Sequence, residues 1–326
     1  MKMQKMVKPS LLCTIMVGGL LSFWSCGTGA QSSPEPSSSV ASVSFAAQVE
    51  PQSQEESEAL QSSSEDSAVS SSSSEWESWQ TPTSLFKDTV FIGDSITLKL
   101  RYYTEQHREA QPDFLDNAQF LVSGALGSGN ALWELSKESV HPSFMGQKML
   151  LEDAVAASGA QKVFVMLGMN DIGLYGPEQS AQNLMELTTR IVEGSPDCTI
   201  YIQSVTPMLQ GKEMKELNIA TIQEYNALVE NWCQEQGYSY LDIYTLLADE
   251  EGFLYPEYCS DPTGAEAQGI HLTDEACQVW LTYLCDFLTA EQEAVQEEEG
   301  ALGETSEGDI TDAGIDAAAE GTVSQE

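Results

Sequence analysis

Short apolar runs recur through the middle of the chain and alternate with stretches of helical periodicity. Five runs are rich in β-branched or aromatic residues, a composition that favours strands: residues 89–92, 119–122, 163–167, 199–205 and 238–243. Helical patterns lie between most of them. Because strands that alternate with helices form parallel sheets covered on both faces, we expect a three-layer α/β/α domain around a five-stranded parallel sheet.

Two of the helical segments have a clear apolar stripe and a clear boundary. Residues 184–192 repeat apolar side chains at three and four positions and end at the Gly-Ser-Pro sequence 194–196, a stop signal. The last helix is expected to start after Thr273, a good N-cap, and to turn the aromatic residues of segment 279–287 inward. Both stripes are predicted to pack on the sheet.

The composition of the two ends removes them from the predicted domain. Residues 27–82 are rich in Ser, Glu and Gln with scattered Pro, and such a segment buries too little apolar surface to offset its ordering entropy. Residues 291–326 carry many Asp and Glu and no Lys or Arg. We therefore expect a disordered tether over 27–82, one domain over 83–290, and a solvated acidic tail over 291–326.

The N-terminus has the pattern of an export signal. Lysines precede an apolar run at 11–24, which is short for a membrane span. Cys26 then stands where a bacterial lipoprotein signal is cut and its cysteine lipidated. We expect a signal over 1–26 and a protein anchored at the bacterial surface by lipid on Cys26. An uncleaved anchor, or ordinary cleavage near Ala30, is the alternative.

Charge and cysteine spacing exclude several classes of function. The formal net charge is −38, so no basic surface is expected to replace the counterions of a nucleic acid. Five cysteines fall within the predicted domain, none of them in a Cys-x-x-Cys spacing, and the three histidines are scattered. A redox or metal protein is therefore disfavoured, and most of these cysteines are expected to be buried apolar residues.

Three short polar motifs follow predicted strands or precede a predicted helix. They are Gly-Asp-Ser at 93–95, Gly-Met-Asn-Asp at 168–171 and Gly-Ile-His-Leu-Thr at 269–273. Ligands of open parallel sheets bind outside the carboxyl ends of the strands. Because Ser95 follows the first predicted strand and Asn170 the third, we expect both side chains at the same edge of the sheet.

These residue types match the needs of acyl transfer. A serine hydroxyl such as that of Ser95 is a weak nucleophile until a base removes its proton, and His271 is the candidate base. The tetrahedral intermediate carries an oxyanion, to which Asn170 can donate a side-chain N–H. His107 and His141 lack a comparable sequence context and are expected to have no part in the chemistry.

In this order and context, the three motifs resemble those of the SGNH (GDSL) hydrolase family over residues 84–289. The resemblance implies a flavodoxin-like α/β/α fold and a serine esterase that uses no metal and no cofactor. It also implies an oxyanion hole formed by the backbone N–H of Ser95, the side chain of Asn170 and the N–H of a glycine. That glycine is matched best by Gly127, with Gly124 next.

One position departs from the family pattern. The family usually has an aspartate three residues before the histidine, where it orients the imidazole. In this chain that position is Gln268, which can accept a hydrogen bond but brings no charge. Asp261 and Glu266 are near in sequence, and either is a candidate for the missing carboxylate beside His271.

The sequence thus predicts a surface-tethered serine esterase that removes acyl groups, with acetyl the expected group, from carbohydrates or small esters. The substrate class rests on the predicted location alone. A catalytically weak or inactive glycan-binding lipoprotein of the same fold is the alternative, because Gln268 replaces the usual acid.

Overall fold

The computed structural model describes residues 84–306, with side chains up to residue 297. The expected export signal, Cys26, the tether and the end of the acidic tail lie outside these residues. None of the described helices is both long enough and apolar enough to cross a membrane.

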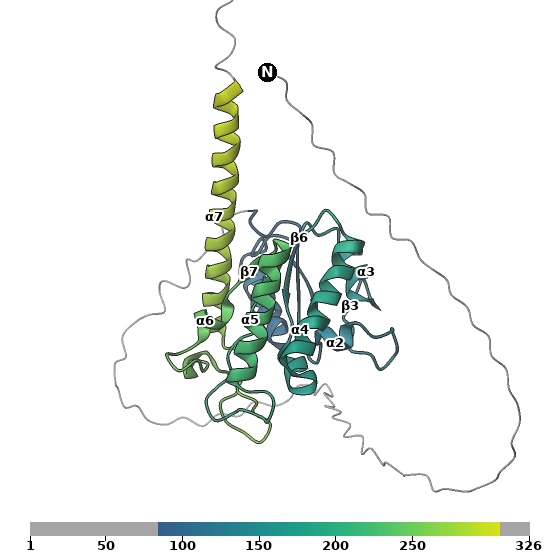
Figure 1. Ribbon diagram of the computed structural model, residues 1–326, viewed down its shortest axis with the longest axis vertical. Coiled ribbons are helices and arrows are strands. Elements are labelled where there is room, and N and C mark those ends of the chain that lie inside the picture. The colour runs from purple at the N-terminus through teal and green to yellow at the C-terminus, as the bar shows by residue number, and fades with distance from the viewer. Residues whose placement is uncertain (1–83, 307–326) are drawn as a thin grey trace, which may run out of the picture. The chain divides into compact units, whose positions relative to one another are not determined.

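A five-stranded parallel sheet forms the centre of the domain (Figure 1). Its order is β2, β1, β5, β6, β7. The bounds of these strands are Gln119–Val122, Thr89–Gly93, Lys162–Met166, Thr199–Gln203 and Ser239–Leu241, respectively. All five coincide with apolar runs in the sequence, and the prediction of a parallel five-stranded sheet is confirmed.

Helices cover both faces of the sheet. Their bounds are α1 Ser95–Ala110, α2 Ser128–Ala131, α3 Leu151–Ser158, α4 Met169–Gly194, α5 Ile219–Gln236, α6 Ile243–Leu247 and α7 Asp274–Ser306. Helices α3, α4 and α5 pack side by side on one face (Figure 1). On the other face, α1 packs on α7. The three-layer arrangement is therefore confirmed.

A row of aromatic rings crosses the sheet and fixes its centre. Phe120, Phe91, Phe164 and Tyr201 come from β2, β1, β5 and β6 and occupy neighbouring register positions. Their ring centroids lie 5.2, 5.0 and 4.5 Å apart in that order, with the planes nearly parallel. Stacked aromatic pairs on adjacent strands stabilise the sheet beyond the area they bury.

The last helix is anchored to the sheet by a buried polar contact. The indole N–H of Trp280, a residue predicted to face the core, donates to the side-chain oxygen of Gln203 at 2.7 Å. The helix continues past the domain boundary expected at residue 290, and Tyr201 donates its hydroxyl to Glu291 at 2.6 Å. Glu, Gln and Ala predominate in this stretch and are good helix formers, so the helix extends into the acidic segment.

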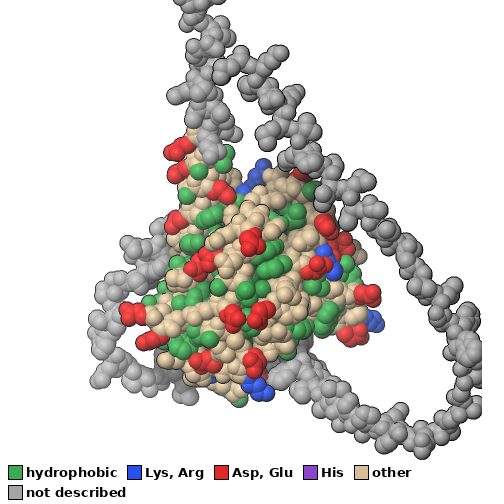
Figure 2. All heavy atoms as spheres, viewed as in Figure 1, with side chains coloured by type: hydrophobic (Ala, Val, Ile, Leu, Met, Phe, Trp, Pro, Cys, Tyr) green, Lys and Arg blue, Asp and Glu red, His purple; other side chains and the backbone are tan. Residues whose placement is uncertain are grey.

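Other differences from the sequence prediction are small. A two-stranded antiparallel hairpin, β3 (Ser143–Phe144) with β4 (Gln147–Lys148), lies in a segment with no strand pattern. Strand β7 ends earlier than expected because Asp242 caps α6, accepting the backbone N–H of Thr245 at 3.0 Å. On the face shown in Figure 2, acidic side chains are dispersed and basic ones are few, as the net charge requires.

Candidate active site

Ser95 is the first residue of α1 and lies directly outside the carboxyl end of β1. The helix is capped by Asp94, whose buried carboxylate accepts the backbone N–H of Ile96 at 2.9 Å. Ser95 itself is half-buried. As the first residue of a 16-residue helix, it places its hydroxyl at the first turn. The positive end of the helix dipole therefore faces any negative charge that develops there.

Asn170 reaches the same place from β5, as the sequence predicts. The turn before α4 needs Gly168, whose φ is +145° and whose Cα lies against the ring of Tyr225. One residue into the helix, the side-chain nitrogen of Asn170 donates to Asp94 Oδ2 at 3.2 Å and to the carbonyl of Leu126 at 3.0 Å. Asn170 thus connects the loops that follow three adjacent strands.

The two candidate glycines have different surroundings. Gly127 is buried, its N–H donates to the side-chain oxygen of Asn130 at 2.9 Å, and a Cβ there would lie 2.7 Å from the carboxylate oxygens of Asp171. Gly124 is exposed, and no described residue accepts its N–H. The preceding residue, Ser123, donates its N–H to Gly93 at 3.3 Å, which holds Gly124 beside the end of β1.

Asp171, which directly follows Asn170, orders the loop after β2. Its buried carboxylate accepts the backbone N–H of Ser128 at 2.8 Å and that of Gly129 at 2.9 Å. Burial raises the pKa of Asp171, and these hydrogen bonds oppose the rise. The Asp171 side chain is therefore committed to the start of α2, and it explains why only glycine fits at position 127.

His271 contacts an aspartate ten residues earlier in the chain. The ring nitrogen Nδ1 lies 2.8 Å from Asp261 Oδ2. A carboxylate can only accept a hydrogen bond, so the proton is assigned to Nδ1 and Nε2 remains free to act as a base. Asp261 also accepts the backbone N–H of His271 at 3.2 Å and that of Gln268 at 2.9 Å.

An antiparallel pairing brings these two residues together. Cys259 pairs with Leu272, and the flanking bonds run from Ser260 N–H to the carbonyl of His271 at 2.9 Å and from Thr273 N–H to the carbonyl of Tyr258 at 3.0 Å. The loop between the paired segments therefore closes with the carboxylate beside the imidazole.

Of the three residues considered for orienting His271, Asp261 is the one that contacts the ring. Gln268 contributes its backbone N–H to Asp261, and neither its side chain nor that of Glu266 bonds to His271 within the described part of the chain. Both side chains are exposed. Sequence reasoning missed Cys259, whose buried thiol donates to Asp261 Oδ1 at 3.4 Å.

The two carboxylates near Ser95 and His271 have pKa values shifted in opposite directions. Burial raises the pKa of Asp94 to about 7, a rise increased by the charge of Asp171 and opposed by the bond from Ile96 and by protonated His271. For Asp261, partial burial also favours the neutral form, but bonds from His271 and Gln268 outweigh it and lower the pKa overall. The charge of His271 thus lowers the pKa of both carboxylates.

The other cysteines and histidines stay apart from this site. All five cysteines of the described region are free thiols, and four of them are buried. Burial raises the pKa of Cys277 and Cys285 to about 12, so both are unreactive thiols at neutral pH. No group of three or more metal-binding side chains occurs between residues 84 and 297.

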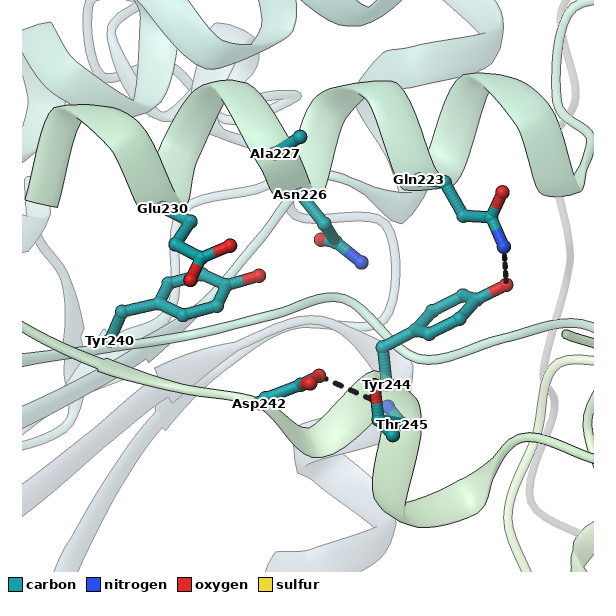
Figure 3. Close-up of a pocket in the computed structure, with 8 residues that line it drawn as sticks. All are labelled: Gln223, Asn226, Ala227, Glu230, Tyr240, Asp242, Tyr244 and Thr245. Carbon is teal, nitrogen blue, oxygen red and sulfur yellow. Dashed lines mark hydrogen bonds between the residues drawn. The ribbon is translucent and has the colours of Figure 1, made fainter.

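A separate cavity of 240 Å³ lies between α5 and α6 (Figure 3). Its polar groups are used within the protein: Gln223 donates to the hydroxyl of Tyr244 at 3.1 Å, and Asn226 bonds to both backbone groups of Val205 at 3.0 Å. These contacts hold the segment after β6 in place, so the residues around this cavity have a structural role.

The chain belongs to the GDSL-like lipase/acylhydrolase family, whose family model matches residues 91–279. This span includes Ser95, Asn170, Asp261 and His271. Membership of the family makes the protein a carboxylic ester hydrolase. None of the curated proteins compared with the chain matches it.

Several solved structures are similar to the chain. A GDSL-like lipase from Bacteroides thetaiotaomicron is 16% identical with a TM-score of 0.46, covering 67% of this chain and 95% of the lipase. A carbohydrate acetylesterase from Sinorhizobium meliloti is 16% identical with a TM-score of 0.43, covering 62% and 98%. The periplasmic domain of a lipopolysaccharide acetyltransferase from Salmonella ser. Paratyphi A is 15% identical with a TM-score of 0.44, covering 62% and 84%.

The Asp261 contact predicts the effect of removing its charge. Asp261→Asn keeps the size of the side chain but no longer stabilises the imidazolium or fixes its tautomer, so kcat for an aryl ester should fall by about 10³–10⁴-fold. Glu266→Gln is the matched control, because it removes a nearby exposed charge that does not touch the ring, and its kcat should equal that of the wild type. Equal losses in the two variants would contradict the assignment.

The raised pKa of Asp94 predicts how stability depends on pH. Between the ordinary pKa of 3.8 and about 7, folded Asp94 keeps a proton that the unfolded chain releases. Proton binding by folded Asp94 therefore stabilises the protein, and this stabilisation is fully present below about pH 4. It decreases as the pH rises and is lost once the pH passes about 7. In Asp94→Asn the acceptor for Ile96 remains but titration is abolished.

Urea unfolding of the wild type and Asp94→Asn at several values between pH 4 and 8 measures this effect. The stability difference should move in favour of the variant as the pH rises, by up to about 1.4 kcal/mol per pH unit. Parallel stability curves for the two proteins would show that Asp94 does not titrate in this range.

Proposed function

We propose that the protein is a surface-tethered serine esterase in which Ser95 is the nucleophile, His271 the general base and Asp261 the residue that orients it. The observation that carries this proposal is the 2.8 Å contact between His271 Nδ1 and Asp261. It leaves Nε2 of the imidazole available to accept a proton, and the charge that His271 would then carry lowers the pKa of Asp94, which directly precedes Ser95.

In the proposed reaction, His271 Nε2 takes the proton of Ser95 while the serine oxygen attacks the ester carbonyl. The tetrahedral intermediate collapses as the C–O bond to the alcohol breaks and His271 returns the proton to the leaving oxygen. Water then attacks the acyl-serine by the same route, with His271 again accepting and returning a proton. The products are the alcohol, the carboxylic acid and free Ser95.

The proposed oxyanion hole has three donors. They are the backbone N–H of Ser95 at the start of α1, the N–H of Gly124, and the side-chain nitrogen of Asn170, which would exchange its bond to Asp94 or to Leu126 for one to the oxyanion. We place Gly124 in this role ahead of Gly127, which matches the family pattern better, because the N–H of Gly127 is taken by Asn130. Each such donor typically contributes about 10²–10³-fold to kcat.

The alternative, an inactive glycan-binding protein, depended on the absence of an acid before His271. Asp261 supplies that acid from the paired segment, so the replacement of the usual aspartate by Gln268 gives no reason to expect inactivity.

The proposed location and substrate rest on the sequence. A lipid-modified Cys26 would hold the domain at the outer surface of a bacterial membrane, where acylated carbohydrates and small esters are its expected substrates. Acetyl is the acyl group expected for such glycans.

Substitution of the nucleophile tests the proposed reaction. Ser95→Ala should abolish hydrolysis of p-nitrophenyl esters and covalent labelling by a fluorophosphonate probe, while Tm stays nearly unchanged because Ser95 is only half-buried. Ser136→Ala, at an exposed serine away from the site, should keep both activities. Hydrolysis at a comparable rate by Ser95→Ala would refute the assignment of the nucleophile.

Substitution of Cys26 tests the proposed anchor. Cys26→Ala removes the thiol that would carry the lipid, so the protein should leave the membrane fraction of expressing cells. Cys13→Ala removes a cysteine from the same leader without affecting the lipid site and should stay with the membranes. Membrane association of Cys26→Ala equal to that of the wild type would indicate an uncleaved anchor instead.

A further inference from the structure

A cavity of 760 Å³ opens beside Asn170. Its floor is apolar and buried and consists of Met169, Leu217 and Ile270. Two exposed apolar side chains, Leu174 and Met214, form part of its wall. We call this space the α4 cavity, because Met169, Asn170, Gly173 and Leu174 all come from the first turns of α4.

The α4 cavity is lined by neighbours of the proposed reacting groups and not by Ser95 or His271 themselves. Asn170 lines it and also donates to Asp94, the residue before Ser95. Ile270, which closes part of the floor, directly precedes His271. Strands β2, β1 and β5 lie in this order in the sheet, so Gly124, Ser95 and Asn170 follow one another along its edge, and the cavity lies beyond Asn170.

The walls of the α4 cavity are fixed by backbone hydrogen bonds. Met214 and Leu217 exchange two bonds of 2.8 Å across a tight turn, in which Lys215 has a φ of +48°. The segment before this turn is bound to the histidine loop, because Leu209 donates to the carbonyl of Gly269 at 2.7 Å. The cavity is therefore preformed between two connected segments, as ligand sites usually are.

We propose that the α4 cavity binds the acyl chain of the ester and that the preferred acyl group is a linear apolar chain of several methylenes. This inference rests on the proposed function, because the chain would extend from an ester carbonyl held at Ser95. A sugar that filled the cavity would press hydroxyls against Met169, Leu217 and Ile270, whose side chains offer them no partner, and burying an unpaired hydroxyl is costly. The polar residues Glu213, Lys215, Glu216 and Gln268 also line the cavity, and all four are exposed.

An acetyl group would leave most of the cavity unused. Its single methyl cannot cover Leu174 and Met214, which are 75% and 46% exposed, respectively. Contiguous apolar side chains left exposed beside a reacting centre are typical of a ligand site. Each methylene that enters such a site should improve kcat/KM by up to about fourfold until the cavity is filled.

Two ester series with the full-length protein test which part of the substrate enters the cavity. In the first, p-nitrophenol is kept and the acyl group grows from acetyl through butanoyl and hexanoyl to octanoyl. In the second, the acyl group stays acetyl and the alcohol grows from methanol to octanol. We expect kcat/KM to rise with acyl length and to stay flat with alcohol length. A flat or falling acyl series, or a rise in the alcohol series alone, would overturn the proposal.

Variants of the cavity wall link this preference to the structure. Leu174→Ser removes apolar surface at an exposed position, and Gly173→Leu places a side chain in the cavity, with its Cβ at an ordinary 3.5 Å from that of Leu217. Both should lower the ratio of octanoyl to acetyl kcat/KM at least tenfold. Leu135→Ser, at an exposed leucine outside the cavity, should keep the wild-type ratio. An unchanged ratio in both cavity variants would refute the assignment.

Ser95→Ala, assayed with the same esters, separates the two proposals. Cleavage that requires Ser95 but shows no preference for longer acyl groups would overturn the role of the cavity and leave the serine esterase standing. No Ser95-dependent cleavage of any ester, together with no labelling by the fluorophosphonate probe, would overturn both.

Discussion

The parallel pairing of β1 with both of its neighbours is the constraint on which the site depends. Gly93 at the end of β1 lies opposite Val122 of β2 and Met166 of β5. Three loops therefore start at the same level, and they are the loops that carry Ser95, Gly124 and Asn170. From β1 the chain continues to β2 on one side, whereas β5 is followed by β6 on the other side, so the strand order reverses between β1 and β5. The three loops surround this topological switch point, where ligands bind in such sheets.

The histidine reaches this edge by a different route. His271 precedes α7 and follows no strand of the sheet, so its position depends on the short antiparallel pairing around Cys259 and Leu272. That pairing does two things at once: it brings Asp261 to the imidazole, and it places Ile270 against the α4 cavity. In the proposed enzyme, orientation of the base and shape of the acyl site therefore derive from the same loop.

The sequence predicts the sheet well because buried parallel strands are continuous apolar runs, which few other elements resemble. It also predicts that Ser95 and Asn170 share an edge, because both directly follow strands.

The sequence leaves the partner of His271 open among Gln268, Asp261 and Glu266. The deciding contact is made through a loop of ten residues whose closure depends on two backbone bonds, and no side-chain pattern encodes such bonds. The oxyanion glycine is open for the same reason, since the bond between Gly127 and Asn130 is local loop geometry.

Two buried carboxylates beside a centre that develops negative charge need a physical explanation. Asp171 is surrounded by backbone N–H groups, which compensate its charge while they order the loop after β2. Asp94 has fewer donors, and its burial raises its pKa to about 7. Like charges repel strongly in a poorly solvated site, so an ionised Asp94 would disfavour an oxyanion at Ser95. Because Asp94 keeps its proton up to about neutral pH, it repels the oxyanion less. In the proposed mechanism, burial thus allows Asp94 to cap α1 and contact Asn170 without placing a full charge next to the reaction.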